Sequence, residues 1–127
     1  MAKVLVVDDE EDVRVVLRRM LIKLGHEVWG VDDGVGALKL LETISFDLVI
    51  TDVYMAAVDG MELLVRIQQR GLCVPVVLMS GGGHMLRDEV LEMGALCGAV
   101  ATLKKPFTLE QLRATIAPLL PPAAAGP

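Results

Sequence analysis

Four short aliphatic runs in this chain each end on polar side chains of a narrow set of types. The runs are Val4–Val7, Leu48–Thr51, Val76–Met79 and Val100–Leu103, and the residues that end them are Asp8 with Asp9, Asp52, Ser80, and Lys104 with Lys105. Short apolar runs that alternate with helical patterns are typical of parallel strands buried on both faces. Because ligands of such α/β sheets bind at the carboxyl ends of the strands, we expect these side chains to meet at one edge of the sheet.

Three carboxylates, a hydroxyl and a lysine at one edge indicate a particular chemistry. Neighbouring carboxylates repel one another, so a cation is expected to neutralise them. Mg²⁺ binds through one or two carboxylates and water, and no His or Cys, the usual ligands of zinc, stands beside these acids. An aspartate can act as the nucleophile that accepts a phosphoryl group, while Mg²⁺ and a lysine stabilise the charge that develops. The pattern therefore predicts phosphoryl transfer onto an aspartate with Mg²⁺ as cofactor.

The same residues lie in five segments that together resemble the receiver domain of two-component response regulators, of the chemotaxis-Y-like kind. The segments are VLVVDDEEDVR (Val4–Arg14), DLVITDVYM (Asp47–Met55), VDGMELL (Val58–Leu64), VPVVLMSG (Val74–Gly81) and GAVATLKKPF (Gly98–Phe107). The resemblance implies a flavodoxin-like, doubly wound sheet of five parallel strands in the order 2-1-3-4-5 with five flanking helices. It also implies a receiver domain over residues 1–120, and the Pro- and Ala-rich residues 121–127 are expected to be a tail or linker.

The resemblance assigns roles to the acidic residues of the expected site. Asp52 takes the place of the phosphoacceptor. Asp9 and Asp52 would hold Mg²⁺ directly, and Asp8 would hold it through water. The backbone carbonyl of Tyr54 takes the place of a further metal ligand.

Three further positions are assigned to phosphoryl binding and switching. Ser80 takes the place of the switch hydroxyl, and Lys105 takes that of the phosphoryl-binding lysine, followed by a proline whose peptide bond is often cis in this family. Thr102 stands where receivers usually carry a Tyr or Phe that turns inward when the switch hydroxyl moves. A threonine has no ring to bury, so this chain departs from the family at that step. The fourth helix and fifth strand would form the face that changes partner binding.

The implied function is that of a signalling receiver rather than an enzyme, which catalyses only its own phosphorylation and dephosphorylation. Its phosphodonor would be a sensor histidine kinase or a phosphotransfer protein, and its downstream partner a target protein or an output domain outside this chain. A formal net charge of −5 and the lack of a helix-turn-helix pattern argue against direct binding of nucleic acid. No apolar run reaches the roughly 18 residues that span a membrane, and no signal peptide is evident, so we expect a cytoplasmic location without membrane contact.

Three other interpretations remain open. Asp8 and Asp9 could simply cap the helix that follows them and complement its dipole. Haloacid-dehalogenase-type phosphatases also place a nucleophilic Asp at a strand end, but they need a second acid two residues later, where this chain has Tyr54. A flavodoxin-like carrier of FMN shares the sheet order, yet the acids after the first strand would repel its phosphate.

Apolar spacing predicts where the helices lie. The stripe of the first helix consists of Val13, Val16, Leu17, Met20, Leu21 and Leu24. Further helices are expected over about 35–42, 61–70 and 90–97, and from Thr108 onwards, with Asp59–Glu62 and Thr108–Gln111 as capping pairs. Residues 26–31 are expected to form an edge strand with His26 at the surface. The glycines at 81–83 precede the expected helix at 90–97, and we expect this segment to re-pack on phosphorylation.

Overall fold

A parallel sheet forms the centre of the molecule. The computed structural model describes residues 1–55, 58–81 and 101–120, and within them five strands pair side by side. They are β1 (Lys3–Val7), β2 (Glu27–Val31), β3 (Leu48–Asp52), β4 (Val76–Ser80) and β5 (Ala101–Lys104). Their spatial order is β2-β1-β3-β4-β5, which confirms the predicted sheet and makes β2 an edge strand. The middle strands β1 and β3 are direct neighbours, with Val7 opposite Thr51.

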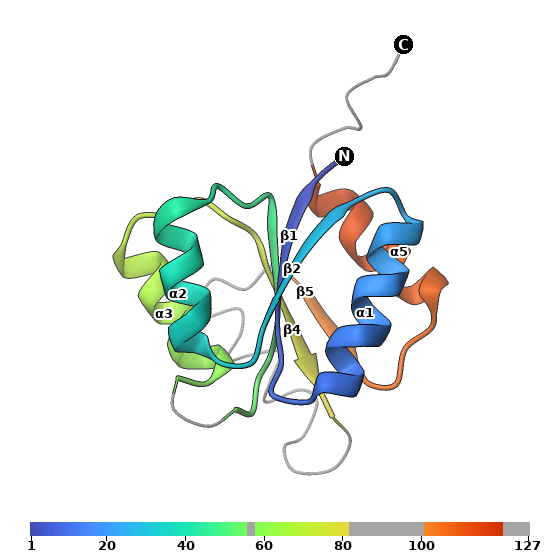
Figure 1. Ribbon diagram of the computed structural model, residues 1–127, viewed down its shortest axis with the longest axis horizontal. Coiled ribbons are helices and arrows are strands. Elements are labelled where there is room, and N and C mark those ends of the chain that lie inside the picture. Colours follow the sequence, from blue (N-terminus) through green and yellow to red (C-terminus); the bar gives the residue numbers. More distant parts are fainter. Residues whose placement is uncertain (56–57, 82–100, 121–127) are drawn as a thin grey trace.

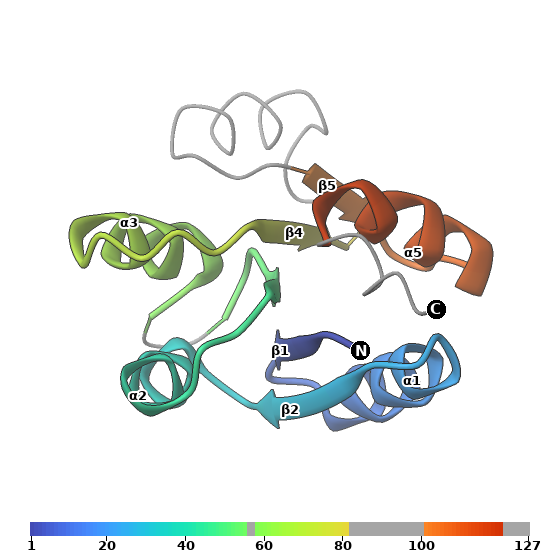
Figure 2. The same cartoon turned by 90° about the horizontal axis from the view of Figure 1, so that it is seen from above.

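Helices cover both faces of the sheet. On one face lie α1 (Glu11–Lys23) and α5 (Leu109–Ile116), and on the other lie α2 (Gly34–Thr43) and α3 (Gly60–Gln69), as Figure 1 and Figure 2 show. A short 3₁₀ helix, η1 (Ala117–Leu119), follows α5. The helix expected over 90–97 and the glycines at 82 and 83 lie outside the described residues. Within the described ranges, no helix is long and apolar enough to cross a bilayer.

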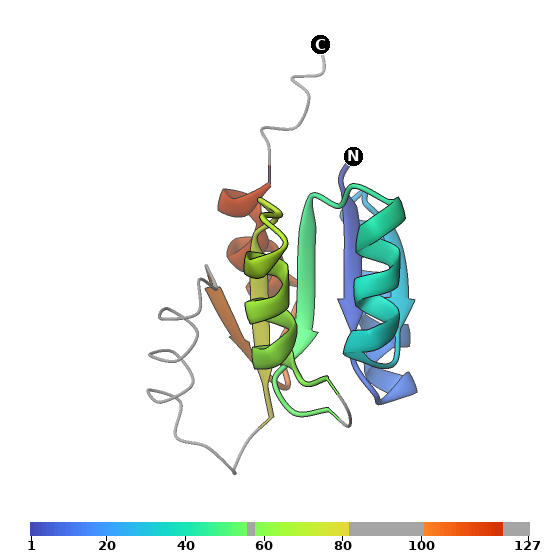
Figure 3. The same ribbon diagram turned by 90° about the vertical axis from the view of Figure 1, so that its left-hand side faces the viewer.

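The sheet separates two hydrophobic cores. Alternate residues of each strand point to opposite faces, so Leu5 packs in the core beneath α2 and α3, whereas Val4 and Val6 pack in the core beneath α1 and α5. Figure 3 views the molecule from the side of α2 and α3. Burial on both faces explains why the strands are almost continuously apolar. It also leaves the strand ends as the places where polar side chains can reach solvent.

The capping residues explain where three helices begin. The carboxylate of Asp33 accepts the Gly36 N–H at 2.8 Å, and that of Asp59 accepts the Glu62 N–H at 2.9 Å. As N-caps they start α2 and α3 at Gly34 and Gly60, one residue earlier than the apolar spacing predicted. The predicted capping box at the start of α5 is confirmed in full, with reciprocal bonds between Thr108 and Gln111.

Two expectations about individual side chains are wrong. Val16 is 48% exposed, whereas Leu17 and Leu21 carry the buried face of α1. Val16 instead borders a surface hollow together with Pro106 and Phe107. His26 is half-buried rather than at the surface. Its Nδ1 accepts the Ala2 N–H at 3.2 Å. Burial lowers the pKa of His26, which suits a neutral ring that acts as an acceptor.

Candidate functional site

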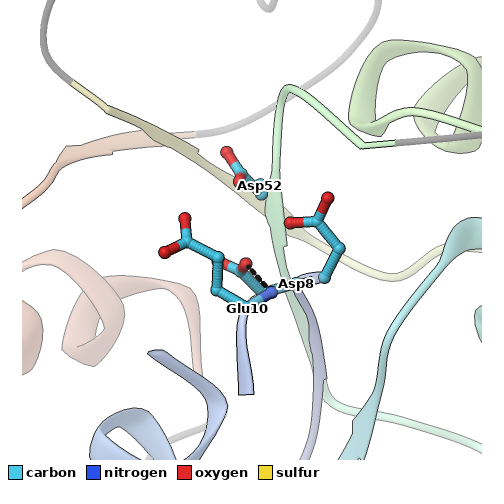
Figure 4. A group of neighbouring side chains, drawn as sticks. Asp8, Glu10 and Asp52 are labelled. Atoms are coloured by element: carbon cyan, nitrogen blue, oxygen red, sulfur yellow. Dashed lines mark hydrogen bonds between the residues drawn. The ribbon is translucent and has the colours of Figure 1, made fainter. Parts of the chain in front are cut away.

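The polar residues that end the strands meet at the carboxyl edge of the sheet, as predicted. Asp8 follows β1 directly, and Asp52 ends the neighbouring strand β3. Lys105 follows β5, and its backbone N–H donates to the carbonyl of Ser80 at 2.8 Å. Figure 4 shows Asp8 and Asp52 side by side at this edge, together with Glu10.

Lys105 connects the two buried aspartates. Its Nζ lies 2.8 Å from Asp8 Oδ2 and 3.1 Å from Asp52 Oδ2. Asp8 is fully buried, Asp52 is 6% exposed, and the Lys105 side chain is 16% exposed. Two desolvated carboxylates therefore share one ammonium group. Buried ionisable groups held together in this way are candidates for a functional site.

Burial and ion pairing act against each other on the pKa values of this group. Burial raises the pKa of Asp52 above its ordinary value, while the charge of Lys105 and its hydrogen bond lower it, so the raised pKa is the net result. For Lys105, burial acts to lower the pKa. The hydrogen bond to Asp8 and the charges of both aspartates together outweigh burial, so the pKa of Lys105 lies above its ordinary value. Lys105 is therefore held firmly as a cation.

Asp8 is bonded through all four of its polar atoms. Its Oδ2 accepts from Lys105, and its Oδ1 accepts the Glu10 N–H at 2.9 Å, the bond drawn as a dashed line in Figure 4. Its backbone N–H donates to Val31 O at 3.1 Å, and its carbonyl accepts from Arg14 Nη1 at 2.6 Å. The N-cap of α1 is Glu10, and among the described residues no side chain forms a capping hydrogen bond at this helix end. The alternative in which Asp8 and Asp9 cap α1 is therefore wrong.

Four carboxylates gather at this point, one more than the sequence predicted. Oxygens of Asp8, Asp9, Glu10 and Asp52 lie within 4.8 Å of one another. Asp8 and Asp52 are buried, whereas Asp9 and Glu10 are exposed. Glu10 directly follows the acidic pair in the sequence, and this position is the signal that could have placed its carboxylate in the group. A set of oxygen ligands without His or Cys fits a hard divalent cation such as Mg²⁺.

The remaining predicted residues are Tyr54, which follows the Asp52 strand end, and Ser80 and Thr102, which lie in β4 and β5. The Tyr54 N–H donates to Asp52 Oδ1 in a long bond of 3.5 Å, and its side chain points to the surface, at 41% exposed for the residue. Ser80 ends β4 opposite Lys104 of β5. Thr102 lies opposite Leu78, two residues further back in the sheet. The metal-binding role of the Tyr54 carbonyl and the switching roles of Ser80 and Thr102 stay predictions.

Gly60 holds α3 against the backbone of the Asp52 strand end. A Cβ at Gly60 would lie 2.1 Å from Asp52 O, and the Gly60 N–H donates to Val53 O at 3.0 Å. The helix therefore cannot move away without losing this bond. We expect Gly60→Ala to destabilise the protein by about 1–3 kcal/mol, the usual cost of overpacking, in chemical denaturation. Gly36→Ala is the control, since its Cβ would meet nothing nearer than 3.4 Å. Equal stability of Gly60→Ala and the unsubstituted protein would contradict this close contact.

Comparisons with known proteins match a segment of the chain that runs from β1 to α5. Residues 4–117 match the family of response regulator receiver domains. The chain is 34% identical over 118 residues to the alkaline phosphatase synthesis transcriptional regulatory protein PhoP of Bacillus subtilis (strain 168). It is 38% identical over 120 residues to the response regulator MprA of Mycobacterium sp. (strain KMS). Both alignments cover 93% of this chain but 48% of PhoP and 50% of MprA, so the chain spans about half the length of these relatives.

A solved structure of a response regulator has the same fold as this chain. The chemotaxis response regulator CheY4 of Vibrio cholerae superposes with a TM-score of 0.83 at 34% sequence identity. The superposition covers 94% of this chain and 99% of that chain. A likeness of this extent agrees with the flavodoxin-like strand order that the sequence resemblance implied.

Proposed function

The chain belongs to the response regulator receiver domain family of two-component signalling, and we propose that it accepts a phosphoryl group on Asp52. The donor would be a sensor histidine kinase or a phosphotransfer protein, and Mg²⁺ would be held directly by Asp9 and Asp52, through water by Asp8, and by the backbone carbonyl of Tyr54. One observation carries the proposal: Lys105 Nζ lies within 3.1 Å of both Asp8 and Asp52 at the carboxyl edge of the sheet. Nucleophile, acidic neighbour and cation thus meet where ligands of this fold bind.

The reaction follows from the positions of these groups. A carboxylate oxygen of Asp52 donates an electron pair to phosphorus and forms the acyl phosphate, while the bond from phosphorus to the donor nitrogen breaks and leaves its pair on the imidazole. Lys105 is placed to offset the charge of the phosphoryl oxygens. Mg²⁺, when bound to the carboxylates, supplies further neutralisation of that charge. Glu10 joins the three predicted acids as a further candidate ligand, since its carboxylate lies in the same group.

We also propose how the phosphorylated chain signals and where in the cell it works. The phosphoryl group on Asp52 would change partner binding through the fourth helix and β5, of which the structure describes β5 (Ala101–Lys104). The partner is a target protein or an output domain outside this chain. The chain works as a signalling receiver in the cytoplasm and catalyses only its own phosphorylation and dephosphorylation. The position two residues after Asp52 holds Tyr54, which lacks the carboxyl group that a haloacid-dehalogenase-type phosphatase would need there.

The metal part of this proposal predicts an effect on stability. Mg²⁺ that binds only the folded protein raises its melting temperature, since a ligand at 100 times its Kd adds about 2.7 kcal/mol. We expect Asp9→Asn to remove most of this Mg²⁺-dependent rise, because it deletes an exposed carboxylate of the cluster. Thermal denaturation over a series of Mg²⁺ concentrations measures the effect. Asp12→Asn is the matched control, an exposed acid on α1 outside the cluster. An unchanged rise in Asp9→Asn would exclude Asp9 as a ligand.

A further inference from the structure

We propose that Arg14 is a positioning residue for the metal site, which it serves through the backbone of Asp8; this inference rests on the proposed function. Arg14 lies in α1 and is half-buried. Its guanidinium group bonds the backbone carbonyl of Asp8 rather than any carboxylate in the part of the chain described. Its charge is thus placed to hold the main chain from which the metal-binding side chains project.

The geometry of Arg14 is that of a strong, directed contact. Its Nη1 lies 2.6 Å from Asp8 O, shorter than the usual N–H···O distance of about 2.9 Å. Short bonds of this kind are typical of a charged donor. Helical side chains lean towards the helix N-terminus, so Arg14 reaches back from α1 to Asp8, three residues before the helix begins at Glu11. The stem of Arg14 passes over Gly30 of β2, where an added Cβ would lie 3.7 Å from Arg14 Cδ.

This bond completes the anchoring of a buried residue. The Asp8 N–H is already held by Val31 O of β2, so Arg14 fixes the second polar group of the Asp8 backbone. Asp9 and Glu10 follow directly and supply the two exposed carboxylates of the cluster. A change in the orientation of the Asp8 carbonyl would therefore move three of the four carboxylates relative to Asp52. Residues that hold metal ligands in place usually change metal affinity about 10- to 100-fold when replaced.

Arg14→Met is the variant that separates positioning from two simpler roles. Methionine keeps an apolar stem and removes the guanidinium group. A positioning role predicts weaker Mg²⁺ binding by about tenfold or more. A purely electrostatic role predicts tighter binding, since the lost cation would no longer repel Mg²⁺. A purely structural role predicts a lower melting temperature with an unchanged Kd for Mg²⁺.

The experiment is a calorimetric titration of the complete chain with MgCl₂, well below the melting temperature of each variant. Arg18→Met, an exposed arginine one turn further along α1, controls for the loss of charge. Arg14→Lys keeps a donor and the charge and is expected to recover most of the affinity. Arg14→Gln, which removes the guanidinium group but keeps a polar amide, serves in place of Arg14→Met if that variant does not fold, with the same weakening expected.

The outcomes distinguish this inference from the proposed function. Mg²⁺ binding that is unchanged or tighter in the folded Arg14 variants would overturn the positioning role and leave the proposed function standing. Absence of Mg²⁺ binding by the unsubstituted chain would overturn both. About tenfold weaker binding in Arg14→Met, with Arg18→Met unaffected and Arg14→Lys largely restored, supports the positioning role.

Discussion

Asp52→Asn is expected to abolish covalent phosphorylation of the chain. With acetyl phosphate and Mg²⁺, the unsubstituted protein should gain one phosphoryl group that is labile to base, as acyl phosphates are. The asparagine amide has nearly the shape of the carboxylate but is a poor nucleophile, so it cannot form the bond to phosphorus. Asp52 ends β3 beside Lys105 Nζ, at 3.1 Å, where an incoming phosphoryl group would meet both. Intact-protein mass spectrometry measures the label directly.

Asp59→Asn provides a matched control for this substitution. Asp59 caps α3, and asparagine is as good an N-cap as aspartate, so the fold and the label should both be retained. Persistence of the label in Asp52→Asn would place the acceptor on another carboxylate, with Asp8 and Asp9 as the nearest candidates. A complete loss in Asp52→Asn alone would also separate this chain from a carrier of FMN, which needs no nucleophile.

Much of the site was predictable because a parallel sheet converts sequence order into spatial order. Buried strands must be apolar along their whole length, so each polar residue that ends a run marks the same edge of the sheet. Asp8, Asp52 and Lys105 could therefore be placed together although 97 residues separate Asp8 from Lys105. The capping pair Thr108–Gln111 was predictable for a similar reason, since its bonds are local to one turn of helix.

The features that sequence analysis missed depend on contacts between elements. Val16 fits the apolar spacing of α1 but is 48% exposed, because Leu17 and Leu21 carry the face of the helix that packs against the sheet. His26 became half-buried because its ring meets the backbone of Ala2, a partner 24 residues away. Glu10 joined the carboxylate cluster because the Asp8 side chain draws the Glu10 N–H towards it. No periodicity in the sequence records such contacts.

Lys105→Met is expected to destabilise the Mg²⁺-free protein strongly. Lys105 pairs with the fully buried Asp8 at 2.8 Å and with Asp52 at 3.1 Å. Removal of one partner from a buried ion pair typically costs about 3–5 kcal/mol, because the remaining charge stays desolvated. We expect a loss near the lower end of that range, measured by chemical denaturation in the presence of a chelator. Lys104→Met, which replaces the exposed residue that ends β5 directly before Lys105, should change stability little.

Mg²⁺ should reverse the effect of Lys105→Met more strongly than it stabilises the unsubstituted protein. The Lys105 ammonium occupies the same Asp8 and Asp52 carboxylates that are proposed to hold the metal, so its removal leaves them free for a cation. Lys105→Met should therefore bind Mg²⁺ more tightly, whereas Arg14→Met should bind it more weakly. The opposite signs arise because Lys105 bonds the Asp8 carboxylate and Arg14 bonds the Asp8 carbonyl. Weaker Mg²⁺ binding in Lys105→Met would show that Lys105 orders the carboxylates rather than competing for them.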